Sequence, residues 1–174
     1  MQAPHTLSFH IRPCSLGHTL VACTTAGVIA ILLGDSPDAV LREFQSAFPA
    51  ATIQPASPAD LEIVRQVVDV VEGTAAPNGL RLDLGGTPFA RKVWSTLQDI
   101  PAGETRSYAD IAAAIAQPKA VRAVARACAA NVLAIVIPCH RVVRSDGTLS
   151  GYRWGASRKE QLLQREQVLL GHRQ

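Results

Sequence analysis

The sequence lacks several features that would assign it to a common class. None of its apolar runs approaches the ~18 residues that a membrane-spanning helix needs. Residues 1–5 (MQAPH) carry neither the basic nor the apolar region of a secretion signal. The four cysteines form no C-x-x-C pair, and their spacing matches neither a common zinc site nor a disulfide framework. We therefore expect a soluble intracellular protein with no metal and no membrane contact.

Aromatic residues make up 5% of the chain and charged residues 18%, yet the charge is unevenly placed. Residues 1–85 carry four basic and eight acidic side chains, a net charge of −4. Residues 86–174 carry thirteen basic and six acidic ones, a net charge of +7. The basic second half is the candidate for a polyanion-binding surface, although a solvated basic face gives the same count.

With 174 residues, 48% of them hydrophobic, the chain can form one domain or two small ones, and it is not disordered. In the first half, apolar periodicity predicts strands over residues 7–11 and 18–33 with a turn at Ala26-Gly27, helices over 37–48 and 58–72, and a strand over 80–84. Ser57 and Asp60 resemble a capping box at the start of the second helix. Gly85-Gly86 is the expected boundary between an α/β domain, residues 1–85, and a second domain, residues 86–174.

The second half is mainly helical by its periodicity. Helices are predicted over residues 88–97, 107–116, 119–129 and 157–170, with an extended segment over 131–138 and a hairpin around 145–147. Ser107 and Asp110 resemble a capping box at the start of the helix over 107–116. The two short central helices have the spacing of a helix-turn-helix. The second of them places basic residues on one face, interleaved with alanines: Lys119, Arg122 and Arg126, with Ala123 and Ala127. This face suits a DNA groove, whereas an ordinary alanine-rich helix with solvated cations is the alternative.

Residues 135–143 (IVIPCHRVV) place a thiol after an apolar segment and next to a histidine. A free thiol is mostly protonated near neutral pH, so Cys139 needs a base, and His140 can take its proton directly or through a water. Glu166 on the last helix could orient His140. Instead of a nucleophile of this kind, Cys139 could be an inert core residue or the nucleophile of a cysteine hydrolase. A hydrolase also needs an oxyanion hole, for which the sequence gives no signal.

The segment PCHRV at residues 138–142 resembles the active-site motif of the O6-alkylguanine–DNA alkyltransferases. Other segments match the family in register: residues 100–105 (IPAGET), 107–108 (SY), 118–124 (PKAVRAV) and 151–155 (GYRWG). The resemblance covers residues 16–167 and is nearest to the Ada-type branch. It implies a ribonuclease-H-like α/β N-terminal domain followed by a mainly α C-terminal domain with a winged helix-turn-helix.

The resemblance also implies direct reversal of DNA damage, with no cofactor. A monomer would bind double-stranded DNA through the minor groove, flip out O6-alkylguanine (or, less well, O4-alkylthymine) and transfer its alkyl group irreversibly to its own cysteine. Such an enzyme would work once, in the bacterial cytoplasm and at the nucleoid when acting. A non-enzymatic lesion-binding relative is the alternative, and the presence of Cys139 argues against it.

The resemblance assigns roles by position. The catalytic residues would be Cys139 as acceptor, His140 as base through a water, Glu166 as its partner, Tyr108 as proton donor to the guanine ring and Asn131 as a tie between helix and active-site segment. Arg122 would fill the vacated base stack, with Lys119, Arg126, Ala123 and Ala127 at the DNA. Tyr108, Val142, Tyr152, Arg153 and Trp154 would form the substrate pocket, with backbone carbonyls near Cys139 and Val142 accepting from the guanine amine.

Two positions depart from the family pattern. Val28 stands where zinc-binding members have a histidine, so we predict no zinc. Trp154 stands where some members have glycine, so we expect it to exclude large O6 substituents. Cys14, Cys23 and Cys128 are expected to be small core residues.

Overall fold

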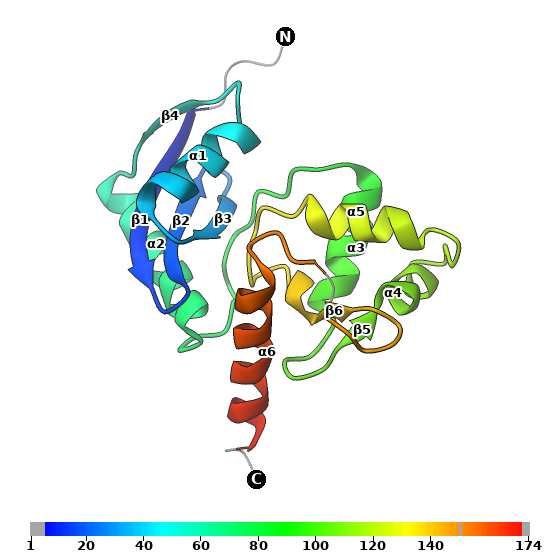
Figure 1. Ribbon diagram of the computed structural model, residues 1–174. Coiled ribbons are helices and arrows are strands. Elements are labelled where there is room, and N and C mark those ends of the chain that lie inside the picture. Colours follow the sequence, from blue (N-terminus) through cyan, green and yellow to red (C-terminus); the bar gives the residue numbers. More distant parts are fainter. Residues whose placement is uncertain (1–5, 150, 172–174) are drawn as a thin grey trace. The chain divides into compact units, whose positions relative to one another are not determined.

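The computed structural model describes residues 6–149 and 151–171, and its chain forms two compact units (Figure 1). The first unit runs to Gly85 and also includes Val132–Ala134; the second comprises Gly86–Asn131 and the residues from Ile135 onward. The division between Gly85 and Gly86 therefore coincides with the change in charge balance, but the return of three later residues to the first unit was not predicted. No helix among the described residues is both long and apolar enough to cross a membrane.

The first unit is a four-stranded sheet with two helices. Its elements are β1 (Thr6–Cys14), β2 (Gly17–Cys23), β3 (Val28–Gly34), α1 (Pro37–Ala47), β4 (Thr52–Pro55) and α2 (Pro58–Glu72). The strand order is β3-β2-β1-β4, antiparallel except for β4, which runs parallel to β1. Consecutive residues of β2, from Thr19 to Cys23, are all buried, so both faces of the sheet are covered there.

The helix ends of this unit follow from local chemistry. Ser36 caps α1 by accepting from the Ala39 amide, and Pro occupies the first turn. The predicted capping box at α2 is confirmed: Ser57 accepts from the Asp60 amide while the Asp60 side chain accepts from the Ser57 amide. Gly73 ends α2 at φ 75°, a conformation that favours glycine.

The strand predicted over residues 80–84 does not form. Only Leu82 makes a bridge, to Val28, because the edge of β3 is shared with a second segment. Farther along that edge, the Ile31 amide donates to Val132 O at 2.8 Å and the Ala134 amide donates to Ile31 O at 2.9 Å. The segment around Leu82 and the segment over residues 132–134 therefore each form one isolated bridge to β3, and neither forms a strand.

The second unit packs short helices around one core. Its elements are α3 (Pro88–Gln98), β5 (Arg106–Ser107), α4 (Tyr108–Ala114), α5 (Val121–Ala129), the 3₁₀ helix η1 (Cys139–Arg141), β6 (Val142–Val143) and α6 (Ala156–Gly171). Helices α3, α4 and α5 contact one another, and Trp94 of α3 donates its indole N–H to Ala127 O of α5 at 2.9 Å. The predicted capping box of Ser107 and Asp110 is confirmed at α4.

Two expected features of this unit differ in the structure. The segment predicted as extended over residues 131–138 turns at Ile135, whose φ of 70° is rare for a β-branched residue. The turn at 145–147 is present, with Gly147 N donating to Arg144 O at 2.9 Å, but none of the described residues after it forms a strand. Instead, β6 pairs in parallel with β5.

Candidate active site

The pairing of β5 with β6 brings two functional segments together. Ser107 of β5 lies opposite Val143 of β6, and α4 starts with Tyr108 directly after β5. Cys139 begins the 3₁₀ turn that leads into β6. Tyr108 and Cys139 therefore line the same cavity, which has a volume of about 360 Å³. Its walls are completed by residues of α5 and of the segment before α6: Ala125, Cys128, Ala129, Gly151, Tyr152 and Arg153.

Cys139 is buried, with 6% of the residue exposed, and its sulfur is held by Asn131. The Asn131 amide nitrogen lies 3.3 Å from Cys139 Sγ and donates to Ile137 O at 3.1 Å. Burial raises the pKa of the Cys139 thiol well above its ordinary value, and the neighbouring Cys128 raises it further, while Asn131 and Lys159 oppose the rise. Cys139 therefore rests as a neutral thiol and needs a base before it can act as a nucleophile.

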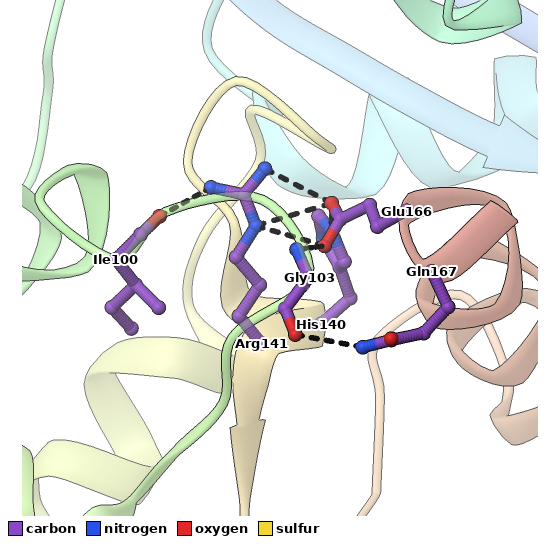
Figure 2. A network of polar contacts seen from close by, with 6 residues as sticks. All are labelled: Ile100, Gly103, His140, Arg141, Glu166 and Gln167. Atoms are coloured by element: carbon purple, nitrogen blue, oxygen red, sulfur yellow. Dashed lines mark hydrogen bonds and ion pairs between the residues drawn. The ribbon is translucent and has the colours of Figure 1, made fainter. Parts of the chain in front are cut away.

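That base is available next to it in the chain. The fully buried His140 places its Nε2 atom 2.7 Å from Glu166 Oε1 of α6. Figure 2 shows the carboxylate of Glu166 at the centre of this network. It accepts from Arg141 Nη2 at 2.9 Å and from the Gly103 amide at 2.9 Å, while Gln167 donates to Gly103 O.

The charges of this network follow from its hydrogen bonds. Burial alone would raise the pKa of Glu166, but the donors His140, Arg141 and Gly103 outweigh it and lower that pKa from 4.5 to about 2. Burial lowers the pKa of His140, and Glu166 only partly offsets this. Near neutral pH, Glu166 is therefore charged and His140 is neutral.

These protonation states decide which nitrogen of His140 can accept a proton. A neutral imidazole facing a carboxylate through Nε2 carries its proton there, an assignment that rests on the hydrogen-bond network. Its Nδ1 is then the bare acceptor. In the part of the chain that the structure describes, Nδ1 is buried and has no hydrogen-bond partner. The arrangement can thus take one proton, directly or through a water.

Sequence reasoning missed Lys159 of α6. The residue is fully buried and its Nζ donates to Val142 O. Burial lowers its pKa from 10.5 to about 8, and the neighbouring Cys128 and Cys139 oppose that shift. Its charge favours the thiolate form of either cysteine. The helical spacing of Lys159, Leu162 and Glu166 places all three on one face of α6, and that signal could have identified Lys159.

The structure brings most of the predicted pocket residues together, but not all of them. Tyr108, Tyr152 and Arg153 line the cavity, whereas Val142 and Trp154 do not. Val142 is buried, and its carbonyl already accepts from Lys159. Trp154 is buried behind Tyr152, against which it packs edge-on with ring centroids 5.2 Å apart. Trp154 can therefore influence the cavity only through its neighbour.

The basic residues predicted to meet DNA occupy the start and one side of α5. Lys119, Arg122 and Arg126 are exposed, although Lys119 precedes the helix, which begins at Val121. Ala123 is half-buried. Ala127 is not on the exposed face: it is buried, because that side of α5 packs on α3 and its carbonyl accepts from Trp94.

Comparison with known proteins relates both units to one family. A family model described as 6-O-methylguanine DNA methyltransferase, DNA binding domain, matches residues 88–168. The bifunctional transcriptional activator/DNA repair enzyme Ada of Escherichia coli is 54% identical over 158 residues, which are 91% of this chain and 45% of that protein. The chain thus spans about half the length of the curated relatives that it matches first.

Solved structures extend the similarity over nearly the whole chain. The O6-methylguanine methyltransferase of Mycobacterium tuberculosis superposes with a TM-score of 0.73 and 31% identity, covering 93% of each chain. The Mycobacterium tuberculosis OGT protein in complex with DNA gives a TM-score of 0.73 and 32% identity, covering 94% of this chain and 93% of that one. With this identity over almost the full length of both, the chain belongs to the O6-methylguanine–DNA methyltransferase family.

Proposed function

We propose that this protein transfers an alkyl group, methyl in the simplest case, from O6 of a modified guanine in DNA to Cys139. One observation carries the proposal. The Cys139 thiol lines a cavity next to a neutral histidine whose Nε2 faces the charged Glu166 and whose Nδ1 has no partner among the described residues. Membership of the methyltransferase family supports the same reaction.

The first step is formation of the thiolate. His140 Nδ1 takes the Cys139 proton through one water, and Glu166 stabilises the resulting imidazolium. The charge of Lys159 and the amide of Asn131 both favour the thiolate, as their effect on the pKa of Cys139 indicates. Binding of a base in the cavity also removes solvent from the sulfur, which makes the thiolate a stronger nucleophile.

In the second step the sulfur attacks the alkyl carbon. The S–C bond forms as the C–O6 bond breaks, and its electron pair leaves with the guanine. The Tyr108 hydroxyl lines the same cavity and donates a proton to the guanine ring, so that neutral guanine departs rather than its anion. The product is a thioether, which has no leaving group that water could displace. The protein is therefore used once.

The lesion reaches the cavity by base flipping. In this proposal, α4 and α5 act as the helix-turn-helix of a winged domain, α5 enters the minor groove of double-stranded DNA, and Arg122 occupies the gap in the base stack. The exposure of Lys119, Arg122 and Arg126 supports this role. Binding as a monomer requires only this surface, and recognition by groove shape and phosphates makes the enzyme nearly independent of sequence.

The decisive experiment is mass spectrometry of the protein after incubation with duplex DNA that contains O6-methylguanine. Trypsin cleavage after Arg126 and Arg141 leaves Cys128 and Cys139 in one peptide, so the adduct must be located by fragmentation. We expect one methyl group on Cys139, none in Cys139→Ala, and none on unmodified DNA. Tight lesion binding without an adduct would instead establish a non-enzymatic damage-recognition protein.

A further inference from the structure

A second thiol lies in the same cavity wall, and the proposed reaction does not use it. Cys128 near the end of α5 is 7% exposed and lines the cavity together with Cys139. The two side chains lie close enough for an interaction with Cys128 to raise the pKa of the Cys139 thiol. The sequence predicted Cys128 to be a small core residue. Packing in the core does not explain why it also lines the cavity that holds Cys139.

The surroundings of this pair favour thiol chemistry on both members. Lys159 is buried close enough to Cys128 and Cys139 to interact with each of them electrostatically. Asn131 donates to Cys139 and holds the acceptor at the end of the segment that follows α5. His140 supplies a base. A thiolate formed on either sulfur is thus stabilised within reach of the other.

We propose that Cys128 and Cys139 form a reversible intramolecular disulfide when the cavity admits hydrogen peroxide. The Cys139 thiolate attacks one peroxide oxygen: the S–O bond forms, the O–O bond breaks and hydroxide leaves with the electron pair. The Cys128 thiol then attacks the sulfenic sulfur: the S–S bond forms and water leaves. The hydroxide takes up the proton that left Cys139, so in total two thiols are oxidised, one peroxide is reduced, and two molecules of water are released.

The step requires the two cysteine side chains to move toward each other, because a disulfide needs its sulfur atoms about 2.05 Å apart. Cys139 lies in a 3₁₀ turn and not within a long helix, and such a turn can shift more readily. The cavity of about 360 Å³ is many times the ~30 Å³ that a water occupies in the liquid, and peroxide is only slightly larger.

The other two cysteines provide an internal comparison. Cys14 and Cys23 belong to the first unit, on β1 and β2, and are not opposite each other: Cys14 pairs with Gly17 and Cys23 with Ser8. Burial, with a contribution from Asp60, raises the pKa of Cys23 to about 11. Because the two cysteines are not opposite each other in the ladder, we expect peroxide to form no disulfide between them.

The disulfide would have two consequences for the acceptor. While it exists, Cys139 cannot receive an alkyl group. It also diverts the sulfenic acid from further oxidation to sulfinic and sulfonic acids, which thiols do not reverse. Because the protein is used once, Cys128 would protect an acceptor that cannot otherwise be renewed.

The test is oxidation of the reduced, full-length chain with hydrogen peroxide, followed by iodoacetamide to block free thiols and by trypsin. The peptide over residues 127–141 holds Cys128 and Cys139 and no other cysteine. We expect this peptide to be lighter than the reduced form by two hydrogens and to carry no iodoacetamide adduct. Dithiothreitol before blocking should restore both adducts. This readout does not require alkyl transfer, so it remains informative even if the proposed function fails.

The matched variants are Cys128→Ser and, as a control in the first unit, Cys14→Ser. In Cys128→Ser we expect Cys139 to gain two or three oxygen atoms that dithiothreitol does not remove, whereas Cys14→Ser should behave as the unchanged chain does. Methyl acceptance, normalised to each variant before oxidation, should recover with dithiothreitol in the unchanged chain and not in Cys128→Ser. The proposal is wrong if the unchanged chain collects oxygens on Cys139 while Cys128 still reacts with iodoacetamide. This outcome is measured on the unchanged chain, so it does not depend on whether a variant folds.

Discussion

The two units bury polar side chains of different kinds. Among the described residues, the first unit buries two hydroxyl-bearing side chains, Ser8 and Thr19. The second buries an amide, an imidazole and an ammonium group, those of Asn131, His140 and Lys159. Burying an ionisable group is unfavourable unless it is paired. Buried ionisable groups are therefore not expected where a side chain serves only the stability of the fold.

The difference predicts that the first unit is stabilised mainly by apolar packing, and that the buried ionisable groups of the second unit serve its proposed chemistry. In the second unit, burial shifts the pKa values of Cys139, His140 and Lys159. In the first unit Phe44, which contacts Phe9 and Phe48, is fully buried in an apolar cluster. Substitutions should therefore separate stability from activity according to the unit in which they fall.

The largest effect is expected for Glu166→Gln. The amide cannot stabilise a protonated His140, and it leaves the Arg141 guanidinium without its carboxylate. We expect methyl transfer to slow on the order of 10²-fold and the free energy of unfolding to fall by about 3–5 kcal/mol. Single-turnover kinetics and urea unfolding measure the two effects. Glu104→Gln breaks only an exposed ion pair with Arg106 and should change stability by less than about 1 kcal/mol.

The same carboxylate predicts a pH dependence of stability. The pKa of Glu166 is lowered from 4.5 to about 2 in the folded protein, so its contribution is complete above pH 4.5 and is lost as the pH falls toward 2. The loss amounts to about 3 kcal/mol. The lowered pKa of His140 adds a loss that starts below pH 6.5. The free energy of unfolding, measured with urea across this pH range, should fall steeply for the unchanged chain and more gently for Glu166→Gln. Parallel plots of this free energy against pH would contradict the assignment.

In the first unit, Phe44→Ala should lower stability without altering the chemistry. Removal of a fully buried phenyl ring costs about 3–5 kcal/mol. We expect the urea midpoint to drop, while the fraction that remains folded accepts one methyl group per molecule at the original rate. A slower reaction per folded molecule would show that the first unit contributes to the chemistry.

Two arginines on opposite sides of the charge division test DNA binding. Arg122→Ala should slow transfer from duplex DNA about tenfold, because a side chain that fills the vacated stack contributes about 1–3 kcal/mol. Arg65 on α2 is exposed and pairs with Glu62 and Asp69. Arg65→Ala should leave the rate and its salt dependence unchanged. Equal losses in both variants would point to general electrostatics rather than a specific helix face.

The last effect, expected for Trp154→Ala, concerns the choice between substrates and not the rate for one of them. Because Trp154 supports Tyr152 and does not itself line the cavity, its removal should let Tyr152 move back and admit a larger substituent. We expect the rate for O6-benzylguanine relative to O6-methylguanine to rise by about tenfold, within the range that one pocket contact confers. A competition assay with both substrates measures the ratio. An unchanged ratio would mean that the tryptophan only stabilises the fold.

The sequence was most informative where structure depends on neighbours in the chain. The capping boxes at Ser57 and Ser107 start α2 and α4 where they were predicted, since a cap needs only residues one turn away. The contact between His140 and Glu166 also agrees with the roles that the resemblance assigned, although those roles themselves remain predictions.

Features that depend on competition between distant segments were not predictable. Leu80 and Leu84 alternate as in a strand, but whether a strand forms depends on the free edge of β3, part of which residues 132–134 occupy. Ala127 has the residue type of a groove-facing position, yet its burial is decided by Trp94 from another helix. Cys128 could be placed beside Cys139 only once the turn at Ile135 was known.

The pairing of Ile31 with residues 132–134 has a consequence for synthesis on the ribosome. The edge of β3 stays without these backbone partners until a segment one hundred residues later has emerged. An open strand edge is a site of unwanted pairing between chains, so nascent molecules are most exposed to aggregation over this interval. The interval closes only five residues before Cys139, so completion of the sheet and emergence of the proposed acceptor fall almost together in time.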